Sequence, residues 1–177
     1  MIYELPNFLS SAECETVAKL FPPPRPATIV KSSSEISKNP IRSGRVSRLL
    51  PKTPEAMRLA ERVHEIITKV NQKIYAFEIA GTEALQLAEY AVGEGYGWHL
   101  DIGPGGTSKR KLSATIQISD PNVYEGGNLE IWGSPPTTRE QGAILLFPAY
   151  LLHRVAPVTH GVRRSLVAWS LGERSFR

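Results

Sequence analysis

Residues 90–101 read YAVGEGYGWHLD, and this stretch ends in two side chains that bind metals, His99 and Asp101. On a β-strand, residues two positions apart point to the same face of the sheet. We therefore expect the imidazole of His99 and the carboxylate of Asp101 to lean into one pocket, while Leu100 points to the opposite wall. An isolated His-x-Asp triplet occurs by chance in many chains, so its meaning depends on what else the sequence offers.

A third candidate ligand and a cation follow downstream. His153 lies in FPAYLLHRVAPV, residues 147–158, and Arg163 comes ten residues later. Two imidazoles and one carboxylate form a facial set that suits Fe(II) and leaves coordination positions open. If a hairpin folds about residue 158, His153 and Arg163 face each other, with Cβ atoms about 5 Å apart. His160 is a rival ligand, but residues 157–161 are typical of a turn, so we expect it to face solvent.

Three ordered motifs resemble those of the prolyl 4-hydroxylase-like 2-oxoglutarate oxygenases. The first follows the pattern Y-x-x-G-x-x-Y-x-x-H-x-D and is carried by Tyr90, Gly93, Tyr96, His99 and Asp101. The second, residues 125–129, is similar to a Gly-Gly-Glu-Leu step, with Asn128 in place of Glu, and we expect its glycines to make a tight turn with positive φ. The third runs from His153 to Val158 and continues to Gly161 and Arg163. The resemblance covers residues 84–172 well and the N-terminal half only loosely.

The resemblance implies roles for individual residues. His99, Asp101 and His153 would be both the metal ligands and the catalytic centre. Arg163 would bind the far carboxylate of 2-oxoglutarate, for which a planar, permanently charged guanidinium is suited. Tyr90 would reach the same co-substrate through its hydroxyl, or alternatively pack as a buried barrel tyrosine.

The strand alternation assigns the neighbours of Arg163. Ser165 returns to the face of Arg163 and is a candidate donor to the same carboxylate, whereas Arg164 points the other way. Residues 103–111, GPGGTSKRK, follow the ligand pair directly and form either a lid over the substrate or a disordered hairpin loop. The aromatic residues near the pocket line its mouth or pack in the barrel: Tyr96, Trp98 and Trp132.

The activity implied by the resemblance is hydroxylation of an unactivated C–H bond, with release of succinate and CO2. The substrate would be a prolyl or other amino-acid residue of a peptide or protein, or a free amino acid. The cofactors would be Fe(II), 2-oxoglutarate and O2, with ascorbate as a candidate reductant. Asp101 favours hydroxylation over halogenation, because related halogenases lack that carboxylate.

Two other functions are weighed against this one. An AlkB-like nucleic-acid demethylase would carry a second arginine six residues after Arg163, where this chain has Trp169. A non-catalytic, metal-binding, cupin-like module would need no arginine for a co-substrate, and measured release of succinate separates it from an oxygenase.

Bulk composition is that of an ordinary globular protein. The 177 residues are 41% hydrophobic and 21% charged, with a net charge of +4 spread along the chain. We expect one domain over residues 1–177, no association with membranes, and no nucleic-acid partner. The first ten residues lack the basic and apolar regions of a signal peptide, and the single Cys14 fits a reducing compartment, so we expect a cytoplasmic protein. Cys14 itself is expected to be a packed core thiol.

The periodicity predicts an α+β chain that is mainly β. Helices are expected at about 11–21 and at 54–70, the second with an apolar stripe through Leu59, Val63, Ile67 and Val70. A polar, mobile loop is expected at 32–40. Strands are expected at 3–9, 27–31, 41–50, 74–80, 84–92, 95–101, 111–119, 128–133, 142–147, 150–156 and 162–171.

The resemblance implies how these elements assemble. It implies a double-stranded β-helix, a jelly-roll or cupin-like barrel, with the N-terminal helices packed on one sheet. Residues 1–80 would form a helical support, and residues 81–177 would form the core barrel that holds the site.

Overall fold

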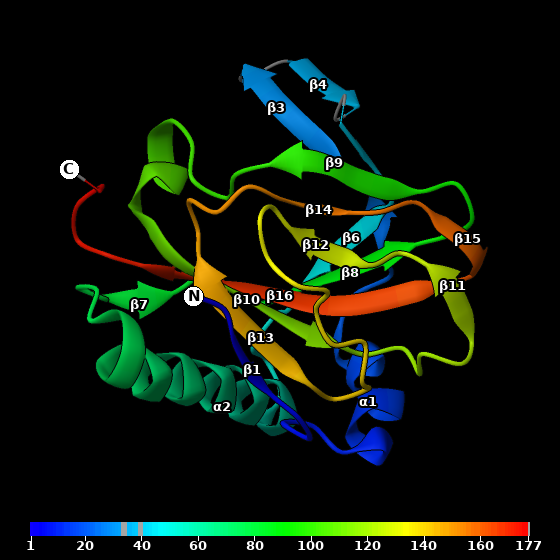
Figure 1. The fold of residues 1–177 in the computed structure, drawn as a ribbon, viewed down its shortest axis with the longest axis horizontal. Coiled ribbons are helices and arrows are strands. Elements are labelled where there is room, and N and C mark those ends of the chain that lie inside the picture. The colour runs from blue at the N-terminus through cyan, green and yellow to red at the C-terminus, as the bar shows by residue number, and fades with distance from the viewer. Residues whose placement is uncertain (33–34, 39–40, 177) are drawn as a thin grey trace.

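The structure is a computed structural model that describes residues 1–32, 35–38 and 41–176. Its larger sheet has the strand order β1-β13-β10-β16-β8-β6-β2, with β7 paired to β16 (Figure 1). The strands of this sheet are β1 (Tyr3–Leu5), β2 (Arg25–Pro26), β6 (Arg45–Arg48), β7 (Gly81–Thr82), β8 (Gln86–Tyr90), β10 (Arg110–Gln117), β13 (Ile144–Pro148) and β16 (Arg163–Leu171).

A smaller sheet of order β12-β14-β9-β5 lies across from the larger one (Figure 1). Its strands are β5 (Arg42–Ser43), β9 (Gly95–His99), β12 (Leu129–Ile131) and β14 (His153–Val155). Two separate antiparallel pairs complete the described strands: β11 (Tyr124–Gly126) with β15 (Val158–Gly161), and β3 (Thr28–Ser32) with β4 (Glu35–Lys38). The two facing sheets are the double-stranded β-helix expected from the sequence.

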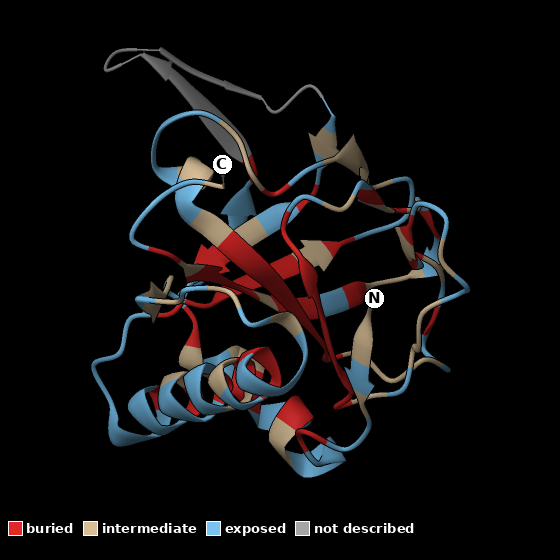
Figure 2. Cartoon of the chain, turned by 60° about the vertical axis from the view of Figure 1, so that its left-hand side comes forward, coloured by how far each residue is buried: buried red, intermediate tan, exposed pale blue. Residues whose placement is uncertain are grey.

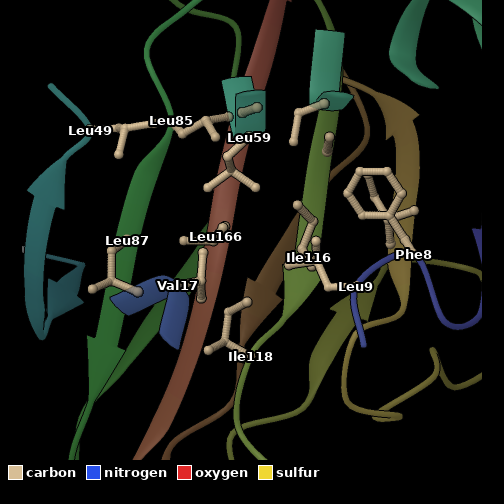
Figure 3. Close-up of a cluster of buried hydrophobic side chains, with 14 of the residues drawn as sticks. Phe8, Leu9, Val17, Leu49, Leu59, Leu85, Leu87, Ile116, Ile118 and Leu166 are labelled. Atoms are coloured by element: carbon tan, nitrogen blue, oxygen red, sulfur yellow. The ribbon is translucent and has the colours of Figure 1, made fainter. Parts of the chain in front are cut away.

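The central strands of the larger sheet are buried on both faces, and their alternation separates two environments. On β10, Leu112 and Ile116 belong to the main hydrophobic cluster, on the side that the helices cover. Thr115 lies on the other face and lines a pocket between the sheets. On β16, Leu166 packs in the main cluster, whereas Arg163 lines the pocket. Figure 3 shows Leu166 and Ile116 within that cluster, and the two are partners across β16 and β10.

Two helices cover the outer face of the larger sheet. Helix α1 (Ser11–Val17) begins with a capping box between Ser10 and Glu13 and continues into a 3₁₀ turn, η1 (Ala18–Leu20). Helix α2 (Pro54–Val70) begins at the cap residue Thr53, whose side chain accepts from the backbone of Ala56. Figure 2 shows the buried stripe of α2 turned toward the sheet and the exposed face turned away. The expected helices and their position on one sheet are therefore confirmed.

The stripe of α2 provides a test of what holds this layer in place. Ile67 has no solvent exposure, and truncating a buried isoleucine to alanine removes about 2–5 kcal/mol of stability. We expect Ile67→Ala to lower the free energy of unfolding by that amount in urea titrations. Met57 on the same helix is 48% exposed, so Met57→Ala is expected to change stability by less than about 0.5 kcal/mol. Equal losses for the two variants would show that α2 is not seated by this stripe.

Several expectations for the N-terminal half are wrong. Residues 74–80 are not a strand: a π-helical turn, η2 (Asn71–Tyr75), continues α2 and ends at Ala76, where φ is 53°. The side chain of Asn71 bonds both the N–H and the carbonyl of Phe77, which fixes this exit. The polar segment 32–40 contains strand β4, and residues 33–34 and 39–40 lie outside the described residues.

The expected division at residue 80 also needs correction. Residues 1–80 contribute β1, β2 and β6 to the larger sheet and β5 to the smaller one, so they are part of the barrel and not only a helical support. Four short strands besides β4, namely β2, β7, β11 and β15, were not expected from the periodicity. Cys14 is buried as expected, and burial raises the pKa of its thiol to about 11. In the part of the chain that the structure describes, no helix is long and apolar enough to cross a bilayer.

Candidate metal and co-substrate site

Two neighbouring strands and one bend bring the three candidate ligands together. His99 ends β9, His153 begins β14, and the two are direct cross-strand partners. Asp101 lies in a bend two residues beyond β9, where its N–H donates to the carbonyl of Ala149 at 3.0 Å. The expected strand over 95–101 therefore stops at His99, and the bend, not strand alternation, turns the carboxylate toward the imidazoles. Leu100 is 44% exposed and does not point to an opposite wall.

The ligand atoms form a compact triangle. The Nε2 atoms of His99 and His153 lie 3.7 and 3.4 Å from the carboxylate oxygens of Asp101, and the possible ligand atoms all lie within 4.8 Å of one another. In each histidine, Nδ1 lies 2.8 Å from the carbonyl two residues earlier, that of Gly97 or Leu151. A carbonyl only accepts, so Nδ1 carries the proton and Nε2 faces the carboxylate. This orientation by a main-chain carbonyl is typical of metal-binding histidines.

Burial and mutual charge set the protonation of the triad. Burial, followed by the charge on His153, lowers the pKa of His99 to about 4. Burial also opposes a charge on His153, but its hydrogen bond and ionic attraction to Asp101 prevail and raise its pKa. For Asp101, burial is outweighed by the bonds from His153 and Ser113, which hold the pKa of the carboxyl well below its usual range. Asp101 is thus an anion and His99 a neutral imidazole near neutral pH, as metal coordination requires.

Ser113 completes the surroundings of Asp101. Its hydroxyl donates to Oδ2 of Asp101 at 2.5 Å, and the residue is 1% exposed. Ser113 is not among the site residues predicted from the sequence, although a signal was present. In the strand that starts at residue 110, Ser113 and Gln117 alternate with apolar residues, and a polar face on a buried strand indicates a lined pocket.

Arg163 lies deep in the same pocket. It is the partner of Tyr90 across β16 and β8, and it is 1% exposed. Its Nη2 donates to Oε1 of Gln117 at 2.9 Å, whereas Nη1 is buried and has no hydrogen-bond partner among the described residues. Burial lowers the pKa of this guanidinium. Gly127 is at φ 62°, as expected for the Gly-Gly turn, and a Cβ there would lie 2.9 Å from Cδ of Arg163.

The prediction of a hairpin about residue 158 is wrong. His153 pairs with His99 and Ile131 in the smaller sheet, whereas Arg163 pairs with Tyr90 in the larger sheet. Residue 158 begins β15, which pairs with β11. His153 and Arg163 therefore face each other from opposite walls of one pocket, not from adjacent strands.

The remaining expectations around Arg163 can be placed. Ser165 is buried on the pocket side of β16 and Tyr90 is buried on β8, and both line the pocket. Arg164 points outward and pairs with Glu89 at 2.8 Å, with 45% of its side chain exposed. His160 is exposed as expected, although it lies on a strand and not in a turn.

The aromatic residues divide between two surfaces. Tyr96 lines the pocket and stacks on His99, with ring centroids 3.4 Å apart. Trp98 and Trp132 instead pack edge to face at 5.4 Å and line a groove beside the pocket. Trp169, which the sequence analysis did not place in the site, lines the pocket as well.

The loop after the ligands is ordered in part. Residues Gly105–Lys109 form a 3₁₀ turn, η3, and Ser108 bonds to Ser175 near the C-terminus at 2.9 Å. A disordered loop is therefore not what the structure shows. A role as a lid remains a prediction.

Comparison with known proteins gives the family. Residues 85–171, which contain all three candidate ligands and Arg163, match the model of the 2OG-Fe(II) oxygenase superfamily. This region of the chain belongs to that superfamily.

Two curated relatives are both named PKHD-type hydroxylases. A PKHD-type hydroxylase from Synechococcus sp. (strain CC9902) is 36% identical over 126 residues, which are 69% of this chain and 56% of that protein. A PKHD-type hydroxylase from Klebsiella pneumoniae (strain 342) is 41% identical over 88 residues, 45% of this chain and 39% of that protein. The chain thus spans about half the length of the curated relatives it matches.

Solved structures of prolyl hydroxylases share the fold. A prolyl-4-hydroxylase from Pseudomonas putida superposes with a TM-score of 0.72 and 20% identity, over 97% of this chain and 92% of that one. A prolyl hydroxylase from Trichoplax adhaerens, in complex with a hypoxia inducible factor peptide fragment, gives 0.74 and 19%, over 97% and 84%. These similarities confirm the prolyl 4-hydroxylase-like double-stranded β-helix.

Proposed function

We propose that this chain is an Fe(II)- and 2-oxoglutarate-dependent dioxygenase that hydroxylates a C–H bond. The observation that carries the proposal is the buried Nη1 of Arg163, a donor that lacks a partner among the described residues in the pocket that the three ligands also line. Leaving a buried donor unsatisfied costs about 1–3 kcal/mol, and more for a charged group. A carboxylate would satisfy this donor, and 2-oxoglutarate offers one at the end away from the metal.

We assign the following roles to the residues of the pocket. His99, Asp101 and His153 fit Fe(II) as two imidazole nitrogens and one carboxylate oxygen. The bound iron and 2-oxoglutarate would supply the oxidation of a C–H bond, coupled to decarboxylation to succinate and CO2. Arg163 would bind the far carboxylate while Gln117 fixes its guanidinium.

The pocket lining adds polar contacts and shields the site from solvent. Tyr90 and Ser165, both buried beside Arg163, are proposed as further contacts of the co-substrate. Tyr96 covers one face of His99 and Leu129 lines the wall opposite the larger sheet. This lining would keep water from the reacting atoms, which strengthens charge interactions inside the site.

For the substrate, we propose a prolyl or other amino-acid residue in a peptide or protein, or a free amino acid. The relatives are named as hydroxylases, and one structural neighbour holds a peptide. We also propose that residues 1–177 act as one domain in the cytoplasm, with ascorbate keeping the iron reduced.

The direct test is succinate formation. Protein stripped of metal and given Fe(II), 2-oxoglutarate and O2 is expected to form succinate, and a peptide and amino-acid screen should reveal a product heavier by one oxygen atom. Zn(II) is expected to inhibit, because it has no redox chemistry. Full turnover with Zn(II) alone would end the oxygenase proposal. Tight metal binding without succinate would favour a non-catalytic module, and turnover of methylated oligonucleotides alone would favour a demethylase.

A further inference from the structure

A second set of contacts surrounds the candidate metal site and is used by none of the roles above. Its centre is Arg110, the first residue of β10, and Glu83, just after β7. Nε and Nη2 of Arg110 donate to the two carboxylate oxygens of Glu83 at 2.6 and 2.8 Å. The two side chains are 12% and 18% exposed, so most of the pair is removed from water. Removing a bidentate pair from water brings little net stability, so its position suggests another purpose.

The free end of Arg110 contacts the metal site at two points. Its Nη1 donates to the main-chain carbonyl of Asp101 at 3.3 Å. Its guanidinium carbon lies 3.8 Å from the ring centroid of Trp169, a residue that lines the pocket. One side chain therefore holds the backbone of the carboxylate ligand and covers a face of the pocket wall.

Local backbone geometry explains why Arg110 reaches this place. The pairing of β10 with β16 shifts register between Arg110 and Ser113, so that β10 has one extra residue there. Such bulges turn a side chain away from its regular direction and are common beside functional sites. The N–H of Glu83 also donates to the carbonyl of Trp169 at 2.8 Å. This bond holds Glu83 against β16, the strand that carries Trp169.

The contacts close into a ring around Asp101. Arg110 bonds its carbonyl, and Ser113, the cross-strand partner of Trp169, bonds its carboxylate. The indole N–H of Trp169 is buried and lacks a partner among the described residues, so its direction is not set by a hydrogen bond of its own. Arg110 is what stacks on this indole.

We propose that Arg110, anchored by Glu83, is a positioning residue that fixes Asp101 and the indole of Trp169 around the bound metal. The proposal rests on the proposed function, since it assumes that Asp101 is a metal ligand. Residues that orient metal ligands typically change metal affinity by 10–100-fold when they are removed. Arg110 would act in this way through the main chain of Asp101, while Ser113 acts on its side chain.

The test measures metal binding without catalysis. Metal-stripped protein is titrated with Co(II) under anaerobic conditions, and the absorption of the bound ion gives its dissociation constant. We expect Arg110→Met to weaken Co(II) binding by about 10–100-fold. Arg164→Met is the matched control, because Arg164 also pairs with a glutamate, on the outer face of β16. It is expected to change the constant less than about twofold, as an exposed pair contributes little.

A double-mutant cycle tests the role assigned to Glu83. If Glu83 acts only by holding Arg110, Glu83→Gln weakens Co(II) binding, but the double variant is no weaker than Arg110→Met alone. Additive losses would mean that Glu83 acts separately and would contradict the pairing. Arg110→Lys retains the charge but lacks the planar fork, so it is expected to bind Co(II) less tightly than the parent. It keeps the test open if Arg110→Met does not fold.

Tryptophan emission gives a second readout that a purely stabilising pair would leave unchanged. With Trp98 and Trp132 replaced by phenylalanine, Trp169 is the remaining tryptophan of the three in the chain. We expect Arg110→Met to make its emission more accessible to acrylamide, since the covering guanidinium is gone. If Arg110→Met and Arg110→Lys bind Co(II) within twofold of the parent, the inference is wrong. If the parent itself binds no Co(II), the proposed function fails instead.

Discussion

Replacement of Arg163 by leucine is expected to raise the apparent 2-oxoglutarate constant at least about a hundredfold. The guanidinium is 1% exposed, is held at Nη2 by Gln117, and keeps Nη1 free for a ligand. A hydrogen bond to a charged group contributes about 1.5–3 kcal/mol, and two such bonds form a bidentate pair. Losing about 2.7 kcal/mol or more corresponds to at least two decades, at about 1.4 kcal/mol per decade.

The adjacent arginine is the control. Arg164 points outward and pairs with Glu89, so Arg164→Leu is expected to change the constant less than about threefold. Steady-state kinetics, measured as succinate release at varied 2-oxoglutarate concentration, show which of the two arginines binds the co-substrate. A large effect at Arg164 and a small one at Arg163 would overturn the assignment of the pocket, and the role proposed for Ser165 with it.

Loss of a candidate ligand is expected to abolish turnover and metal binding together. His153→Ala removes one of three ligands and should weaken Fe(II) binding by more than about a hundredfold, beyond the usual effect of an orienting residue. Asp101→Ala should do the same, because it removes the charged ligand and leaves Ser113 without its acceptor. Anaerobic equilibrium dialysis measures the metal, and succinate release measures the turnover.

Fold and function can be separated in this test. The main hydrophobic cluster lies on the other face of the larger sheet and contains none of the ligands, so circular dichroism of the variants should remain that of the parent. His160→Ala is the matched control, since His160 is exposed. Metal binding by His153→Ala equal to that of His160→Ala would mean that the metal site lies elsewhere.

The local pattern of apolar and polar residues was sufficient to predict the helices and most strands of the barrel. Pro54 predicts where α2 begins, and the apolar stripe predicts that it continues to Val70, because the stripe repeats with the period of a helix. The ligand candidates His99, Asp101 and His153 could be named because metals require few residue types at set spacings. The compact triangle that they form agrees with that expectation.

Which strands pair with each other could not be predicted from the local pattern. The spacing of His153 and Arg163 is compatible with a hairpin, yet the chain crosses from one sheet to the other between them. Spacing carries no information about which sheet a strand joins. Ser113 and Gln117 alternate with apolar residues, which indicates a polar face on their strand. That this face lines the metal pocket is known only once β16 and β13 are placed beside β10.

The two-sided burial of β10 has a consequence for how this protein can change over time. Its odd-numbered residues from 113 to 117 line the pocket or contact Asp101 and Arg163, and its even-numbered residues from 112 to 116 belong to the main hydrophobic cluster beneath the helices. Inserting or deleting one residue there would exchange the two sets, since a one-residue slip moves every side chain to the opposite face. A single substitution in β10 changes one side chain, whereas an insertion or deletion changes the direction of many side chains at once. We therefore expect evolutionary novelty in substrate choice to arise in the connecting loops, where insertions leave that parity intact.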